Sequence, residues 1–222
     1  MTERSLTRRE RYRQETLAEI KQRAMRQIAQ GGAGALSLNA IARAMGMSGA
    51  ALYRYFASRD HLLAEVIVDA HHDLAEVLQA AAGRPAAPVA RFQAVTGAYR
   101  TWALADPHRY RLIFSSPVGS GHLEPGRVLP AAQRSMDSFL SVLAAMGGSR
   151  PGPAVPPGLS AQLEAWHARS GMSALPPATL LRVLQAWTRL HGVLSLELDG
   201  HLTATGIDPA LLYQAEVDLL AG

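Results

Sequence analysis

Residues 48–56 carry side chains whose types and spacing suit contact with the edges of nucleic-acid bases. Ser48 can begin a helix here, because its hydroxyl can accept a hydrogen bond from a backbone N–H of the first turn. Leu52 and Phe56 then turn inward, and four residues are left facing out: Gly49, Ala50, Tyr53 and Arg54. The guanidinium of Arg54 can form two hydrogen bonds to guanine, whereas Ala50 can make only apolar contact, as with a thymine methyl. The segment therefore predicts a helix that fits the major groove of DNA.

A second short helix is expected immediately before this segment. One apolar face is formed at helical spacing by Leu38, Ile41, Ala42 and Met45. Ser37 supplies an N-cap, and Gly46 can adopt the left-handed conformation that ends a helix. The backbone N–H groups beside Ser37 and Ser48 also suit phosphate binding, although capping alone would explain both serines. Two short helices around a tight turn, followed by a longer helix, form a helix-turn-helix.

Positive charge is concentrated in the same part of the chain. Residues 1–59 contain eleven Lys and Arg, Arg43 among them, against four acids, a net charge of +7; the other 163 residues carry −3. Each cation that neutralises a phosphate releases a counterion, so we expect DNA affinity to fall steeply with salt. The basic stretch from Arg4 to Arg13 is either a solvated, frayed tail or an arm that reaches an adjacent minor groove.

The same stretch closely resembles the amino-terminal domain of TetR-type transcriptional regulators. The resemblance rests on Ile41-Ala42, Gly46-Met47-Ser48, Leu-Tyr-Arg-Tyr-Phe at 52–56 and Ser58 to Leu63. It implies a homodimeric, all-helical repressor whose larger carboxy-terminal domain binds a small molecule and releases DNA. It also implies phosphate contacts for Tyr53 and for Arg59, where the family usually has lysine. The alternatives are a half-buried aromatic that braces the domain for Tyr53 and a solvated surface charge for Arg59, and Tyr55 either packs or contacts phosphate. The predicted DNA-binding residues are Ser37, Arg43, Ser48, Gly49, Ala50, Tyr53, Arg54, Tyr55 and Arg59.

Composition excludes several other classes of protein. The chain has 222 residues, is 48% hydrophobic and contains no cysteine, which removes disulfides, thiolate metal sites and cysteine nucleophiles. The charged amino terminus lacks the apolar core of a secretory signal, and no apolar run approaches the length of a membrane span, so we expect a cytoplasmic protein. His71 and His72 are adjacent and cannot share a helix face as a metal pair would. We therefore expect no metal, no cofactor and no catalytic residues.

Helical periodicity and its interruptions predict an all-α fold with two domains. Residues 1–65 form a three-helix DNA-binding domain, which a long fourth helix from Ser58 to Gly83 joins to a helical effector-binding and dimerisation domain, residues 66–222. Gly31 and Gly32 end the first helix. Loops are expected at 115–126 and 147–158, where Gly, Ser and Pro accumulate. The later helices are expected at 88–105, 107–114, 128–146, 159–169, 176–199 and 209–219.

The carboxy-terminal half carries a second resemblance. Residues 98–114 and 186–202 are similar to the effector domain of the TetR subgroup named for its Trp, His and Gly signature, here Trp187, His191 and Gly192. Gly192 would let another backbone approach closely. An apolar cavity with few polar anchors is the usual small-molecule site, although aromatic residues at helical spacing also form ordinary core. The candidate ligand-binding residues are Trp102, Tyr110, Phe114, Phe139, Trp166, Trp187 and His191.

The last two long helices are the predicted dimer seam. Their apolar stripes contain Leu184, Leu190, Leu194, Leu198, Leu212 and Leu219, which either meet a second subunit or complete the protomer core. We call the helix predicted at 48–56 the reading helix. A two-fold dimer would set its two reading helices about 34 Å apart, which is one turn of DNA, or a multiple of that distance. The sequence thus predicts a ligand-responsive regulator released from a palindromic operator by a small apolar or aromatic molecule. An activator, a helical small-molecule-binding protein and an enzyme using a pair such as His191 and Glu197 are the alternatives.

Overall fold

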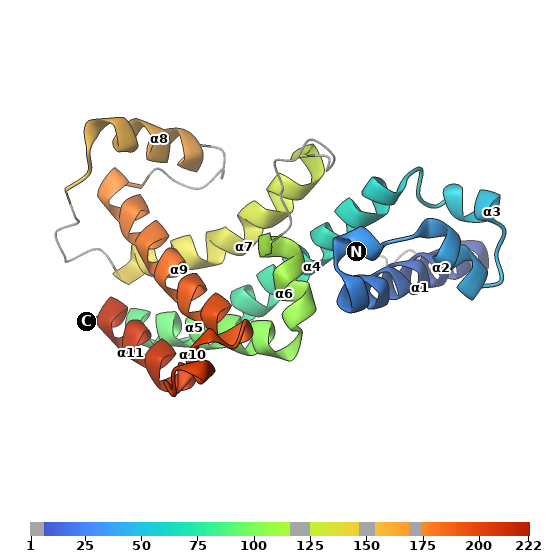
Figure 1. Ribbon diagram of the computed structural model, residues 1–222. Helices are drawn as coiled ribbons and strands as arrows, with labels where there is room; N and C mark the ends of the chain where they lie inside the picture. Colours follow the sequence, from blue (N-terminus) through green and yellow to red (C-terminus); the bar gives the residue numbers. More distant parts are fainter. Residues whose placement is uncertain (1–6, 116–124, 147–153, 169–174) are drawn as a thin grey trace. The chain divides into compact units, whose positions relative to one another are not determined.

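The computed structural model describes residues 7–115, 125–146, 154–168 and 175–222, and in these ranges helices are joined by turns and loops, with no strand (Figure 1). This confirms the all-α fold class. A single 3-10 turn, η1, covers Ala33–Ala35. The α-helices are α1 (Arg8–Gly31), α2 (Leu38–Ala44), α3 (Gly49–Tyr53), α4 (Arg59–Ala82), α5 (Pro88–Ala105), α6 (Pro107–Ser115), α7 (Pro125–Met146), α8 (Pro157–His167), α9 (Pro177–Leu198), α10 (His201–Ala204) and α11 (Pro209–Ala221).

The chain forms two compact units. The first unit combines Met1–Ala70 with His108–Pro130, and the second combines His71–Pro107 with Ala131–Gly222. Helices α4 and α7 therefore each contribute residues to both units. The described residues 108–115 and 125–130 thus belong to the unit of the amino-terminal helices, which no local pattern in the sequence indicates. The domain boundary after residue 65 stays a prediction.

Helix α1 begins at Arg8 because Thr7 and Glu10 form a reciprocal capping box. The backbone N–H of Glu10 donates to the Thr7 hydroxyl at 3.2 Å, and the N–H of Thr7 donates to the Glu10 carboxylate at 2.8 Å. These hydrogen bonds to Thr7 lower the pKa of Glu10. Arg8 to Arg13, expected as part of a frayed tail or of an arm that reaches a minor groove, are thus helical, whereas residues 1–6 lie outside the described ranges.

The turn between α2 and α3 follows the sequence prediction closely. The hydroxyl of Ser37 accepts from Ala40 N at 3.3 Å, and that of Ser48 accepts from Ala51 N at 3.2 Å. Gly46 has φ +65°, and two backbone bonds close a Schellman motif: Met47 N to Ala42 O at 2.9 Å and Gly46 N to Arg43 O at 3.1 Å. Glycine is required at this position because other residues rarely adopt a positive φ.

In the second unit, α9 lies at the centre and contacts α5, α8, α10 and α11 (Figure 1). Its inward face is buried through Leu180, Val183, Ala186, Leu190 and Leu194. The Tyr213 hydroxyl on α11 donates to Thr96 O on α5 at 2.9 Å, which ties the last helix to this core. None of the described helices combines the length and the apolar character that crossing a membrane requires.

Three local predictions differ from the structure. Helix α7 begins at Pro125 rather than Val128, and Pro157 and Gly158, expected as loop, form the first turn of α8. Proline fits a first turn because the N–H it lacks has no partner there. Gly200 ends α9 with φ +76° as expected, but a further short helix, α10, follows it. Of the two expected loops, residues 154–156 are non-helical as expected, and 116–124 and 147–153 lie outside the described residues.

Candidate nucleic-acid interface

Helix α3 presents most of its predicted reading face to solvent. Leu52 and Phe56 are buried, whereas Tyr53 is 49% exposed and Ala50 and Arg54 are exposed too. Gly49 is only half-buried, and a Cβ added to it would lie 3.6 Å from Asn39 Oδ1 on α2. The face open to a base edge is therefore centred on Ala50, Tyr53 and Arg54.

The starts of α2 and α3 hold their capping serines in different surroundings. Ser48 is exposed, but Ser37 is half-buried, and its backbone N–H donates to the side-chain oxygen of Gln27 on α1 at 2.8 Å. Gln27 thereby fixes the entry of α2 against α1, a positioning role that the sequence pattern did not indicate. Arg43 is exposed near the end of α2.

Tyr55 packs against an arginine of α1. The guanidinium carbon of Arg13 lies 5.5 Å from the centroid of the Tyr55 ring, and Tyr55 is half-buried. This is the geometry of a cation–π contact. Packing therefore accounts for part of the Tyr55 surface, and its phosphate contact stays a prediction.

Arg59 is bonded to the chain that precedes α2. Its Nε donates to Leu36 O at 3.1 Å, a second guanidinium nitrogen donates to Ala33 O, and a third lies 3.2 Å from an Asp60 carboxylate oxygen. The guanidinium thus closes the η1 segment onto the start of α4. A phosphate contact for Arg59 stays a prediction beside this structural role.

Replacing Arg59 with alanine is expected to lower the free energy of unfolding by about 1–3 kcal/mol without DNA, because two backbone carbonyls lose a charged donor. Chemical denaturation of the free protein measures this. Arg54→Ala is the matched control, since Arg54 is exposed on the same unit and should leave stability unchanged. Equal stability of the two variants would leave Arg59 with no structural role.

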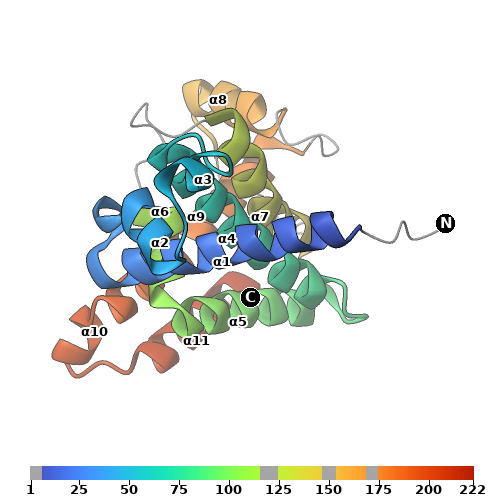
Figure 2. The same cartoon turned by 90° about the vertical axis from the view of Figure 1, so that its right-hand side faces the viewer.

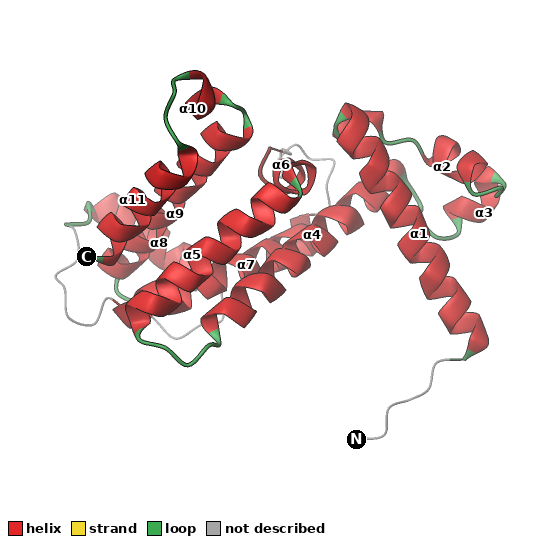
Figure 3. Ribbon diagram, turned by 90° about the horizontal axis from the view of Figure 1, so that it is seen from below, coloured by secondary structure: helices red, strands yellow, loops and turns green. Residues whose placement is uncertain are grey.

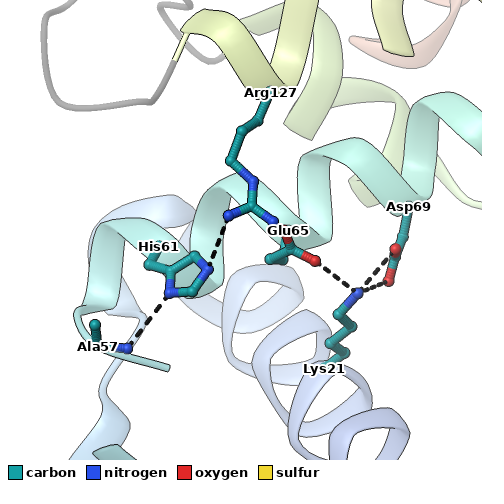
Figure 4. A network of polar contacts seen from close by, with 6 residues as sticks. All are labelled: Lys21, Ala57, His61, Glu65, Asp69 and Arg127. Carbon is teal, nitrogen blue, oxygen red and sulfur yellow. Dashed lines mark hydrogen bonds and ion pairs between the residues drawn. The ribbon is translucent and has the colours of Figure 1, made fainter. Parts of the chain in front are cut away.

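A polar network braces α1 and the start of α7 against α4 (Figure 4). Lys21 Nζ on α1 lies 3.3 Å from Glu65 Oε2 and 2.8 Å from Asp69 Oδ2. Arg127 on α7 pairs with the other carboxylate oxygen of Glu65, and its second nitrogen lies 3.3 Å from His61 Nε2. Sequence reasoning missed this network, because each contact that joins α4 to α1 or to α7 links residues 44 or more positions apart in the chain.

The network ends beside the reading helix. The backbone N–H of Ala57, which follows α3, lies 3.4 Å from His61 Nδ1 (Figure 4). A neutral imidazole has one acceptor nitrogen, so His61 can accept from Ala57 or from Arg127 but not from both at once. Arg127 at the start of α7 and Ala57, between α3 and α4, therefore compete for the His61 side chain.

The predicted ligand-binding aromatics are divided between the two units. Tyr110 and Phe114 lie together on α6 in the first unit, with ring centroids 4.9 Å apart, and the other five belong to the second unit. There the Trp102 indole donates to Asp73 on α4 at 2.7 Å, and Trp166 is half-buried on α8. A ligand role for all seven stays a prediction.

Within the second unit, Tyr99 links several of these side chains. Its ring meets Phe139 edge-on at 5.5 Å, and its hydroxyl lies 3.2 Å from His191 Nδ1. His191 also stacks on Trp187, with centroids 5.1 Å apart, and burial lowers the pKa of its imidazole. Tyr99 was not among the predicted residues, although its spacing with Phe92 and Val95 places it on the inner face of α5. Among the described residues, no cluster of His, Asp and Glu could hold a metal ion.

The predicted dimer leucines differ in exposure. Leu190 and Leu194 are fully buried within the protomer, so neither has solvent-accessible surface that a second subunit could bury. Leu184, Leu198 and Leu212 are half-buried, and Leu219 is exposed. Two further exposed leucines, Leu196 on α9 and Leu211 on α11, were not predicted.

The capped α2–turn–α3 arrangement, in an amino-terminal segment of strong positive charge, defines a helix-turn-helix DNA-binding protein. A sequence model of the family described as "Bacterial regulatory proteins, tetR family" matches residues 20–66, and one described as "Tetracyclin repressor-like, C-terminal domain" matches residues 92–220. The chain belongs to the tetR family of bacterial regulatory proteins. The subgroup with the Trp, His and Gly signature stays a prediction.

Relatives along the whole chain support this assignment. The chain is 33% identical to the HTH-type transcriptional regulator Rv1816 of Mycobacterium tuberculosis over 94% of its length and 92% of that protein. It is 44% identical to the regulatory protein SCO4313, whose crystal structure matches with a TM-score of 0.80 over 96% of this chain and 98% of that one. PfmR of Thermus thermophilus, 18% identical with a TM-score of 0.59 over 91% and 96%, shares the fold. The protein is a DNA-binding transcriptional regulator and not an enzyme.

Proposed function

We propose that the protein is a homodimeric repressor that binds a palindromic operator and leaves it when a small apolar or aromatic molecule binds. The observation that carries the proposal is the exposed face of α3, with Tyr53 and Arg54 on a unit that is strongly basic. We assign operator binding to residues 1–65, and effector binding and dimerisation to the remainder. Ser37, Arg43 and Ser48 would add phosphate contacts around the reading helix.

Dimerisation through α9 and α11 is supported by apolar surface that the protomer does not cover. Leu211 is 71% and Leu219 61% exposed on α11, and Leu196 is exposed on α9. A Cβ added to Gly192, four residues before Leu196, would have no neighbour within 4 Å among the described residues. The protomer's own packing therefore does not require this glycine, and the close approach that it permits is available to a second copy. Paired helices from two copies would form a four-helix bundle.

The first compact unit contains segments through which effector binding could change operator binding. Residues 108–115 of α6 and residues 125–130 at the start of α7 belong to the same compact unit as the reading helices. Arg127 contacts Glu65 and His61 on α4, and it competes for His61 with the backbone N–H of Ala57, which follows α3 (Figure 4). A ligand that moves α6 or α7 would alter these contacts and must bind better to the DNA-incompetent arrangement, since equal affinity shifts nothing.

Selection of bound duplexes from a random DNA library, at low and at moderate salt, tests the proposal. We expect a palindrome with half-sites about one helical turn apart. Compounds that release the protein from this palindrome would then identify the effector class. Retention of DNA without sequence preference would contradict specific regulation, and no retention at low salt would favour a ligand-binding protein without DNA recognition.

Arg54→Ala is expected to relax base preference at one position of each half-site. Loss of a bidentate contact to guanine costs about 1–3 kcal/mol, roughly a 5- to 150-fold loss at that position. Binding to a set of operators with single base changes measures this. Arg84→Ala removes the same charge from an exposed site in the second unit and is the control. A uniform loss across all operators would remove Arg54 from the base-reading residues.

A further inference from the structure

The amino-terminal end of α1 extends beyond the part of the helix that contributes buried residues. Its buried residues are Thr16, Ile20, Ala24 and Ile28, so the eight residues from Arg8 to Glu15 precede the first buried position. At about 1.5 Å per residue they form an extension of about 12 Å. In Figures 2 and 3 the amino-terminal turns of α1 project past α2 and α3. The capping box of Thr7 and Glu10 begins the helix at the far end of this extension.

One face of this extension continues the buried stripe and carries no acidic residue. Arg9, Tyr12 and Arg13 lie seven, four and three residues before Thr16, so they share its side of the helix. Glu10 and Glu15 fall on other sides. Tyr12 is 69% exposed, although the equivalent positions further along the helix are buried. We name Arg9, Tyr12 and Arg13 the α1 basic face.

The α1 basic face adjoins the reading helix. Arg13 stacks on Tyr55, two residues after the end of α3, at 5.5 Å. Through this contact the face meets the residue that directly follows Tyr53 and Arg54 in the chain. All of these residues belong to the first compact unit.

The charge of the extension is unfavourable for the free helix. Arg8, Arg9 and Arg11 stand in the first turns of α1, where the positive end of the helix dipole disfavours cations. The arrangement becomes favourable when a polyanion lies alongside. A phenol and two guanidinium groups on one face can all donate hydrogen bonds to phosphate oxygens.

We infer that the α1 basic face binds the phosphate backbone of DNA flanking the operator half-site. The inference rests on the proposed operator binding and adds a second contact surface to it. The occupant is duplex backbone, without base readout, so the contribution is independent of flanking sequence. Duplex DNA carries one charge per about 1.7 Å when both strands are counted, which is about 3.4 Å per base pair. An extension of about 12 Å therefore has the length of roughly three or four base pairs.

The test compares two duplexes, one that ends at the outermost recognised base pair and one that extends about five base pairs further on each side. For the unaltered protein, we expect tighter binding and a steeper salt dependence on the longer duplex. In Arg9→Ala/Arg13→Ala, the salt slope on the longer duplex should fall by about 0.9 for each arginine lost, so by up to about 3.6 in a dimer. Arg9→Lys/Arg13→Lys should retain the slope, and Arg84→Ala is the control for loss of charge elsewhere.

The double alanine variant could bind DNA more weakly because a flanking contact is lost or because Tyr55 loses its packing against Arg13. Binding to the short duplex distinguishes these two causes. On this duplex the double alanine variant should bind like the unaltered protein. An equal loss on both duplexes would mean that Arg13 acts only by supporting Tyr55, and an unchanged slope on the longer duplex would mean no flanking contact; either result overturns the inference. Failure of the unaltered protein to select any palindrome would instead overturn the proposed function.

Discussion

The double variant Leu211→Glu/Leu219→Glu is expected to be a monomer and to bind the operator about 10²- to 10⁴-fold more weakly than the unaltered protein. Both side chains are exposed on α11, so the substitutions place charge on the proposed seam without entering the protomer core. Two linked half-site contacts gain affinity because the second binds as an intramolecular event, and a monomer loses that gain. Analytical ultracentrifugation and operator titration measure the two effects on the same samples.

Leu129→Glu is the matched control for this experiment. Leu129 is an exposed leucine on α7, with 55% of its surface accessible, and it lies outside α9 and α11. We expect this variant to remain dimeric and to bind the operator normally. Leu194→Glu would be uninformative, because Leu194 is fully buried and a charge there would destabilise the protomer itself. If the α11 variant stayed dimeric, or bound the full palindrome as a monomer, the proposed seam would be wrong.

The helix-turn-helix could be predicted from the sequence because its signals are local. Ser37, Gly46 and Ser48 each act on backbone groups within about five residues, and caps and left-handed glycines leave recognisable residue types. Leu52 and Phe56 are buried and Tyr53 and Arg54 exposed, as helical periodicity predicts. These features depend on spacing alone.

Features set by tertiary contacts could not be predicted in the same way. The sequence marks Arg59 as a cation, but not that its guanidinium meets the carbonyls of Ala33 and Leu36. It likewise identifies apolar positions on α9 and α11 without indicating which face the protomer's own core. Leu194 is buried and Leu211 exposed although both are leucines on amphipathic helices, since helix packing rather than residue type decides the outcome.

Acidification from pH 6.5 to pH 4 is expected to lower the stability of the second unit through His71. This side chain is 4% exposed on α4, and its Nε2 has no hydrogen-bond partner among the described residues. Its Nδ1 lies 3.5 Å from the Ser135 hydroxyl, which donates to His71 O at 3.0 Å. Burial, and next the adjacent His72, lower the pKa of His71 from 6.5 to about 4.

The direction of the effect follows from the order of the two pKa values. Below pH 6.5 the unfolded chain binds a proton on His71 that the folded chain does not bind until about pH 4. The free energy of unfolding therefore falls with decreasing pH across this window and is unaffected by His71 above it. At about 1.4 kcal/mol per pH unit, the loss is about 3 kcal/mol by pH 4.

Denaturant unfolding of the unaltered protein, His71→Gln and His71→Phe at pH 7.5 and pH 4 measures this contribution. The comparison between proteins cancels the titration of carboxylates and of His191, so the stability of each variant relative to the unaltered protein should rise by about 3 kcal/mol on acidification. Gln keeps a polar group at the site and Phe keeps a ring, so a shared result cannot come from lost packing alone. His201→Gln, at an exposed histidine on α10, should show no such change. A stability difference that is the same at both pH values would show that His71 takes up its proton equally in the folded and unfolded chain.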